Sequence, residues 1–320
     1  MSPSRREFLA TTGSCACYLA AAAPLVPLAA RSRWAEGPPS AGARHQTPFA
    51  RLEPVGDGLT AIISTPLEGD FTTICNGGII EGSSGTLVVE AFGTPEGARW
   101  AAERARDLTG RWPTHVVVTH HHGDHVAGVA GFREGGSAPE LYVTEETRDR
   151  VLERAEEASA RAPWADVIIL PGTEPVHIDL GDRDVSVVPR RGHTGSDVTV
   201  EIDGGLGPVW CGDLVWNAMF PNFVDAAPSR LSSAVGALGA LPTDLYVGGH
   251  GPVSNGAAFA AYVGMLQSVE AAAREAWRRG LTAAEAADEY EVPSSLGEWM
   301  LFNPLFYQRA MEAWLRELEG

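Results

Sequence analysis

The sequence predicts an α/β fold in which a few antiparallel strands come first and strands then alternate with helices. Two patterns support this class. Between residues 59 and 91, short apolar runs are separated by glycine-rich turns, as in consecutive antiparallel strands. From residue 95 onward, segments of helical periodicity alternate with short β-branched runs. The composition agrees, because 44% of the 320 residues are hydrophobic and 20% are charged, which allows a sizeable core.

The N-terminus resembles a twin-arginine export signal. The pair Arg5-Arg6 precedes a mildly apolar stretch that ends near Ala30, so we expect residues 1–30 to be a signal peptide. A permanent membrane anchor is the alternative, but glycine, serine and threonine make the stretch weakly apolar for that role. Cleavage after Ala30 and cleavage after Ala43 both stay open. The expected localisation is periplasmic or secreted, with the twin-arginine translocase as partner during export and no stable membrane span after cleavage.

The other elements can be placed in order along the chain. Residues 31–48, rich in proline, glycine, alanine and arginine, are typical of a flexible leader. Residues 49–255 form the predicted main domain, and its expected strands are Leu59–Ser64, Thr72–Ile80, Gly85–Ala91, Thr114–Thr119, Leu141–Thr144, Val167–Leu170, Val176–Leu180, Val185–Pro189, Val198–Ile202, Val209–Cys211 and Leu245–Val247. Its expected helices are Pro95–Leu108, Glu145–Ala160 and Ser229–Leu241.

Residues 256–320 change to alanine-rich helix. The expected segments are Ala257–Arg279, Thr282–Tyr290 and Asn303–Glu319. None of them carries a motif residue. We therefore expect a helical cover that belongs to the same domain.

The charge of the chain excludes one class of partner and one kind of chemistry. The formal net charge is −17, and all 24 basic residues are arginines. An acidic chain without a basic run is not expected to bind nucleic acid. A chain without lysine cannot use a lysine nucleophile or Schiff base.

Four cysteines are present, and two of them, Cys15 and Cys17, lie in the expected signal. The other two, Cys75 and Cys211, can pair only if the fold brings their Cα atoms within roughly 7 Å. We expect two buried thiols instead.

The chemistry of the chain is concentrated in the segment Thr119–His125. Its sequence, Thr-His-His-His-Gly-Asp-His, holds four of the nine histidines and follows an apolar run that is expected to be a buried strand. His120 and His122 are two residues apart on extended chain and so face the same way. Asp124 and His125 are adjacent and point differently, so one loop can serve two metal positions. Imidazole and carboxylate ligands together suit zinc.

This segment resembles the His-x-His-x-Asp-His signature of the metallo-β-lactamase superfamily. The resemblance implies three further ligands later in the chain, and His193, Asp213 and His250 occur in the right order, each next to glycine. It covers roughly residues 50 to 255. The fold that it implies is a four-layer αββα sandwich, here with extra C-terminal helices.

The resemblance also implies a role for each residue. Two zinc ions are expected per chain, the first held by His120, His122 and His193, the second by Asp124, His125 and His250, with Asp213 between them. A hydroxide on the metals would attack an acyl bond, and Asp124 would orient it as the catalytic residue. Glu90 stands near the place where the family has an aspartate that supports the metal loop from behind the ligands. The remaining histidines, His45, His115, His121 and His177, are expected to be hydrogen-bonded core residues.

Two residues are candidates for binding a small-molecule substrate. Trp216 stands where one β-lactamase branch has a lysine and some lactonases have a tyrosine, so an apolar wall would suit a hydrophobic substrate. Arg191, beside Arg190, either binds a substrate anion or is a solvated loop residue.

The sequence favours hydrolysis over other activities. His122 occupies the position where the oxygen-reducing diiron relatives have glutamate, so zinc hydrolysis is favoured over redox chemistry. The bond is an amide or lactam, an ester or lactone, or a thioester, although export argues against glutathione thioesters, which are chiefly cytoplasmic. The alternative function is a zinc-binding accessory protein of an exported oxidoreductase system with little turnover.

Overall fold

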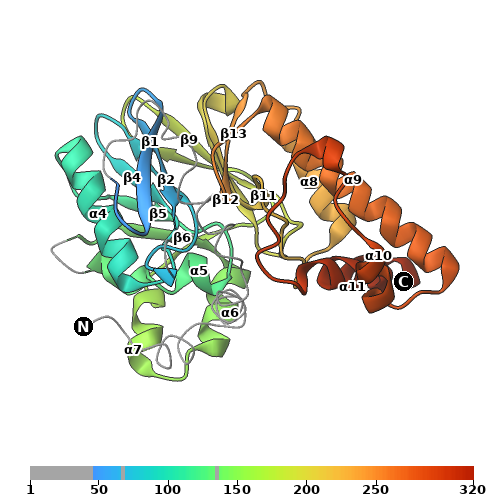
Figure 1. Cartoon of the computed structure of the whole chain (residues 1–320). Coiled ribbons are helices and arrows are strands. Elements are labelled where there is room, and N and C mark those ends of the chain that lie inside the picture. The colour runs from blue at the N-terminus through green and yellow to red at the C-terminus, as the bar shows by residue number, and fades with distance from the viewer. Residues whose placement is uncertain (1–45, 66–68, 134–136) are drawn as a thin grey trace.

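The computed structural model describes residues 46–65, 69–133 and 137–320, and two β-sheets stand face to face at its centre (Figure 1). The expected signal peptide and nearly all of the expected leader lie outside the described residues. In the described part, no helix has the length and apolarity needed to cross a bilayer.

The first sheet has seven strands that lie in the order of the chain. They are β1 (Ala50–Gly56), β2 (Leu59–Ser64), β3 (Gly77–Glu81), β4 (Thr86–Val89), β5 (His115–Val117), β6 (Glu140–Thr144) and β7 (Ile168–Leu170). Strands β1 to β4 pair antiparallel and β4 to β7 pair parallel. Parallel neighbours need a crossover, and here the crossovers contain the helices α4 (Pro95–Thr109), α5 (Gly123–Val126), α6 (Glu145–Arg154) and α7 (Ala158–Arg161).

The second sheet has six strands in the order β13-β12-β11-β10-β9-β8. They are β8 (Val176–Asp179), β9 (Asp184–Pro189), β10 (Val198–Ile202), β11 (Val209–Trp216), β12 (Leu245–His250) and β13 (Ser254–Asn255). Only β11 and β12 pair parallel, and α8 (Pro228–Leu238) connects them. The carboxyl ends of these two strands therefore lie side by side.

Alternating side chains along the strands build the layers. In β2, Ala61 and Ile63 face the second sheet, whereas Ile62 faces the alanine-rich side of α4. On the outer face of the second sheet, β11 packs against α8 and against the C-terminal helices α9 (Gly256–Arg279) and α11 (Phe306–Glu319). Figure 1 shows α4 on one side of the paired sheets and α8 with α9 on the other. The predicted four-layer αββα sandwich is confirmed.

The extra C-terminal helices predicted from the sequence are present, and their ends have identifiable caps. The α9 helix begins after Asn255, whose side chain accepts a hydrogen bond from Ala258 N, and ends at Gly280 with a left-handed φ of 68°. The next helix, α10 (Ala283–Glu289), begins with a capping box between Thr282 and Glu285.

Some predicted boundaries are wrong. The strand expected over Thr72–Ile80 begins only at Gly77, because Thr72 bonds locally to the side chain of Asp70 and Ile74 has a positive φ of 64°. Strand β11 continues beyond Cys211 to Trp216. Both Cys75 and Cys211 are buried free thiols, as expected, and burial raises the pKa of Cys75 to about 12.

Removing the indole of Trp210 should destabilise the sandwich. Trp210 is buried between the sheets, where its Nε1 donates to Gly77 O at 3.0 Å and joins β11 to β3. We expect Trp210→Ala to lower the free energy of unfolding by about 3–5 kcal/mol, as for other large core truncations. Trp277→Ala, which removes a half-exposed indole from α9, is the control and should stay within about 0.5 kcal/mol. Equal urea midpoints for the two variants would contradict this assignment.

Candidate metal centre

The seven side chains that the sequence marks as candidate ligands meet at one edge of the two sheets. Four come from the segment that follows β5 in the first sheet, and three come from the second sheet. The first four are His120, His122, Asp124 and His125, and the other three are His193 after β9, Asp213 in β11 and His250 at the end of β12. Ligands of open α/β sheets commonly bind at such carboxyl ends of strands.

Three imidazoles and one carboxylate form the first group. Its members are His120, His122, His193 and Asp213, whose ligand atoms all lie within 4.8 Å of one another. His122 Nδ1 lies 3.0 Å from His193 Nε2, and Asp213 Oδ2 lies 3.3 Å from the same nitrogen. Neighbouring ligand atoms around a tetrahedral zinc are about 3.3 Å apart. The spacing of this group therefore suits one zinc ion.

The second group consists of Asp124, His125 and His250. Asp124 Oδ2 lies 3.2 Å from His250 Nε2 and 3.5 Å from His125 Nε2. Asp213 joins this group through its other oxygen, because Oδ1 lies 3.2 Å from His125 Nε2 and 3.4 Å from His250 Nε2. One carboxylate thus presents one oxygen to each group.

The burial of these polar side chains points to a bound cation. None of the seven residues is more than 5% exposed. Within the described residues, eight of their polar atoms have no hydrogen-bond partner, and these are His120 Nε2, both ring nitrogens of His125, His193 Nδ1, His250 Nε2, Asp213 Oδ1 and both carboxylate oxygens of Asp124. A buried polar group without a partner costs roughly 1–3 kcal/mol. Two metal ions would give a partner to five of these atoms, the Nε2 atoms of His120, His125 and His250 together with Asp213 Oδ1 and Asp124 Oδ2, so the donor set fits the metals that the family resemblance implies.

The buried site shifts the pKa values of its candidate ligands in both directions. Burial lowers the pKa of His193 to about 3 and the pKa of His120 well below its usual range, so both are neutral imidazoles. Burial raises the pKa of Asp213, but the surrounding imidazoles, with His250 foremost, outweigh it and hold that pKa well below its usual range. Burial lowers the pKa of His250, but Asp213 and Asp124 outweigh it and raise that pKa to about 9. A proton at His250 Nε2 therefore competes with a metal ion for the same lone pair.

Glu90 lies behind the cluster, at the end of β4. Its Oε1 is 3.1 Å from His125 Nδ1 and accepts a hydrogen bond from the hydroxyl of Thr119, and its Oε2 accepts from the backbone N–H of Thr119. Glu90 has a positive φ of 79°, which is uncommon for a residue other than glycine. These contacts hold the residue in a strained conformation and connect two segments of the site.

Asp225, in the loop between β11 and α8, was not predicted from the sequence. Its Oδ2 accepts a hydrogen bond from His122 Nε2 at 2.9 Å and lies 3.6 Å from His121 Nε2. The contacts with His121 and His122 hold the pKa of this carboxyl well below its usual range. No motif spacing marks Asp225, because it lies 103 residues from His122 in the chain.

Two other polar side chains that the sequence did not predict hold ligand loops in place. The amide of Asn76 donates to two carbonyls of the loop around His250, at 2.9 and 2.7 Å. Asp197 accepts from the two backbone N–H groups that flank His193, at 2.9 and 2.8 Å. These partners are backbone atoms, which leave no signature in residue type, so single-sequence reasoning could not find them.

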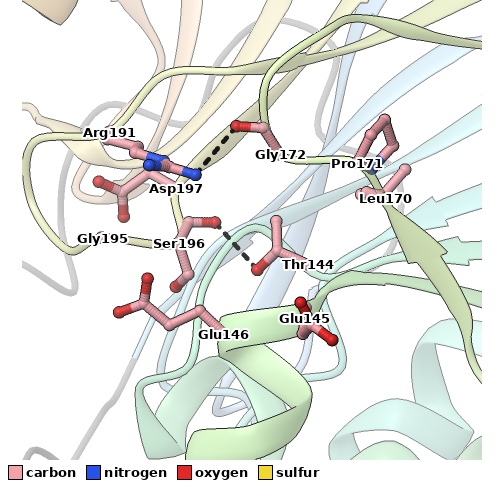
Figure 2. Close-up of a pocket in the computed structure, with 10 residues that line it drawn as sticks. All are labelled: Thr144, Glu145, Glu146, Leu170, Pro171, Gly172, Arg191, Gly195, Ser196 and Asp197. Atoms are coloured by element: carbon pink, nitrogen blue, oxygen red, sulfur yellow. Dashed lines mark hydrogen bonds between the residues drawn. The ribbon is translucent and has the colours of Figure 1, made fainter.

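The two predicted substrate residues lie in different places. Trp216 is buried, and its ring centroid lies 4.1 Å from that of His250, so it packs on the cluster itself. Arg191 is exposed and donates to Gly172 O at 3.2 Å. It lines a cavity of about 160 Å³ to which none of the seven candidate ligands contributes (Figure 2). The structure thus brings Trp216, but not Arg191, to the cluster.

The four histidines that are not candidate ligands differ in burial. His121 is buried and bonded to Ser196 Oγ at 3.1 Å, and His115 is partly buried and bonded to Thr114. The prediction of a core residue is wrong for His177, which is exposed because β8 is an edge strand of the second sheet. His45 lies outside the described residues.

An αββα sandwich with buried histidines and aspartates at its sheet edge defines a class of hydrolase with a candidate metal centre. A family model of the metallo-beta-lactamase superfamily matches residues 71–250, which is more than half of the chain and includes all seven candidate ligands. The chain belongs to the metallo-beta-lactamase superfamily. The superfamily and the named relatives are hydrolases, so this chain is an enzyme of that class.

Curated relatives and solved structures agree with this assignment. The chain is 30% identical to a hydroxyacylglutathione hydrolase of Acidiphilium cryptum over 71% of its own length and 84% of the relative's. It is also 30% identical to a hydroxyacylglutathione hydrolase of Cereibacter sphaeroides over 65% and 73% of the two lengths. Its fold is similar to a metallo-beta-lactamase from Pontibacter korlensis, with a TM-score of 0.56, 17% identity and coverage of 68% and 99%. A metallo-beta-lactamase from Erythrobacter litoralis has a TM-score of 0.54, 16% identity and coverage of 70% and 98%.

A side chain at residue 249 should displace the central carboxylate. A Cβ added at Gly249 would lie 1.9 Å from Asp213 Oδ1. We expect Gly249→Ala to weaken metal binding at least tenfold, as changes beside metal ligands commonly do, measured by zinc titration with a chelating indicator. Gly236→Ala in α8 is the matched control, because a Cβ there meets no atom within 4 Å. Unchanged zinc affinity in Gly249→Ala would show that the close approach of residue 249 to Asp213 does not affect metal binding.

Proposed function

We propose that this protein is an exported dinuclear zinc hydrolase that cleaves an acyl bond of a small molecule. The observation that carries the proposal is the position of Asp213, whose two oxygens face two separate groups of buried ligand atoms. A carboxylate in that place can be shared by two cations. The family membership supports the class of reaction.

In this proposal His120, His122 and His193 would hold the first zinc, and Asp124, His125 and His250 would hold the second, with Asp213 contributing one oxygen to each. Zinc suits these donors, because its protein ligands are imidazole and carboxylate in a closely spaced shell. The ions, when bound, supply Lewis acidity that polarises a carbonyl and acidifies water at neutral pH.

The chain's own residues then orient the reactants and move the proton. Both oxygens of Asp124 are buried without hydrogen-bond partners, and Oδ2 lies 3.2 Å from His250 Nε2. We assign Asp124 the catalytic role, since Oδ1 is available to orient the attacking water and accept its proton. Glu90 would keep His125 in place through its contact with Nδ1.

The substrate is an amide or lactam, an ester or lactone, or a thioester. The relatives named above are hydroxyacylglutathione hydrolases, which supports a thioester, whereas export favours a substrate present outside the cytoplasm. Trp216, which is buried beside His250, would support that ligand from behind instead of forming a wall in contact with the substrate. Arg191 could reach a substrate only if that substrate extended to the cavity of Figure 2.

Turnover on a panel of acyl substrates tests the hydrolase. We expect zinc-loaded protein to hydrolyse at least one member of a panel containing a chromogenic β-lactam, an aryl ester, a lactone and a glutathione thioester. A chelator should abolish that activity, and readdition of zinc should restore it. Asp124→Ala should lower kcat by about 100-fold or more, because a positioned general base contributes that much.

No chelator-sensitive turnover on any member would favour the accessory protein instead. Two bound zincs and full activity in Asp124→Ala would refute the role of Asp124. Elemental analysis of the purified protein should be run beside the assay, since it reports the number and identity of the metals directly.

Export is tested in the signal itself. The translocase reads a pair of guanidinium groups, which lysine does not reproduce. We expect the double substitution Arg5→Lys and Arg6→Lys to leave the protein in the cytoplasm, measured by cell fractionation. The matched control, Arg31→Lys with Arg33→Lys, changes two arginines outside the motif and should leave export intact. Periplasmic protein from the double variant would refute the twin-arginine route.

A further inference from the structure

The two ring nitrogens of His122 face different partners. Nδ1 lies 3.0 Å from His193 Nε2 within the first group, and Nε2 lies 2.9 Å from Asp225 Oδ2. An ionised carboxylate can only accept hydrogen bonds, so the proton of a neutral His122 belongs on Nε2. The lone pair is then on Nδ1, directed toward the point that the first group shares.

A series of polar contacts leads from the same carboxylate to the loop of His193. Asp225 Oδ2 lies 3.6 Å from His121 Nε2, and His121 Nδ1 is bonded to Ser196 Oγ at 3.1 Å. Ser196 Oγ contacts Thr194 Oγ1 at 3.1 Å, and Thr194 Oγ1 donates to Asp197 at 2.6 Å. Asp197 in turn accepts from the backbone on both sides of His193. Two ligand segments that lie far apart in the sequence are thereby connected outside the ligands themselves.

We infer that Asp225 is a positioning residue that fixes the tautomer and the ring orientation of His122, with His121 as the connection to the His193 loop. The inference rests on the proposed metal centre for its functional meaning. Carboxylates that accept the second N–H of a ligating histidine commonly change metal affinity by 10–100-fold when they are removed. The Asp225 side chain is 45% exposed, so its substitution breaks the contact without opening a cavity in the core.

The tautomer is the first measurement, and it needs no substrate. In metal-free protein labelled with ¹⁵N-histidine, long-range proton–nitrogen spectra should show His122 protonated at Nε2 alone. Asp225→Ala should show a mixture of the two tautomers and should bind the more tightly held zinc 10–100-fold more weakly. Asp225→Asn should retain the tautomer and recover part of the affinity, because an amide oxygen still accepts the N–H.

Asp184→Ala is the matched control. It breaks another aspartate–histidine contact, between Asp184 and His177 at 3.1 Å, on an exposed edge strand away from the cluster. That variant should leave the tautomer of His122 and the zinc affinity unchanged. Circular dichroism of all three variants confirms that each one is folded.

Two outcomes would overturn the inference. One is Asp225→Ala with the wild-type tautomer and zinc affinity within twofold of the wild type. The other is a third equivalent of bound zinc that disappears in both Asp225→Ala and His121→Ala, since the carboxylate would then be a ligand of its own ion. A tautomer that depends on Asp225 in a protein without turnover on the substrate panel would instead refute only the proposed hydrolase.

Discussion

The site depends on one buried carboxylate surrounded by imidazoles. Asp213 is 2% exposed, and a charge in that position is strongly unfavourable unless its partners are close and well oriented. Oδ2 faces the first group of candidate ligands and Oδ1 faces the second. The neighbouring backbone positions are therefore glycines, which have no side chain to occupy this space. Gly212 has a φ of 51° and approaches Thr119 so closely that a Cβ would lie 2.5 Å from its hydroxyl, and Gly249 leaves room for Asp213 itself.

Much of the fold and of the site was predictable, because each rests on a local pattern. The alternation in β2, with Ile62 toward α4 and its neighbours toward the other sheet, is visible as a run of apolar residues between turns. The segment Thr119–His125 is equally distinctive, since no strand or helix needs four histidines in seven positions for packing. This segment and the order of the three later residues, His193, Asp213 and His250, together predict the cluster.

The features that were not predictable depend on contacts between distant parts of the chain. Asp225 approaches His122 across 103 residues, and Asn76 and Asp197 hold ligand loops through backbone atoms. The expected strand at Thr72 fails for a different reason, because the side chain of Asp70 offers its backbone a competing local partner. Trp216 shows a third limit, since its place in the sequence did not reveal that it packs against His250 and is buried.

The candidate ligands are divided between the sheets, four following β5 and three from the second sheet. An ion coordinated by either group with Asp213 is therefore held by both halves of the sandwich at once. Metal binding would stabilise the interface between the sheets. The free energy of unfolding would then grow with the logarithm of the free zinc concentration. Folding and metal supply would then be a single coupled equilibrium, so a cell that withheld zinc would weaken the architecture as well as the chemistry.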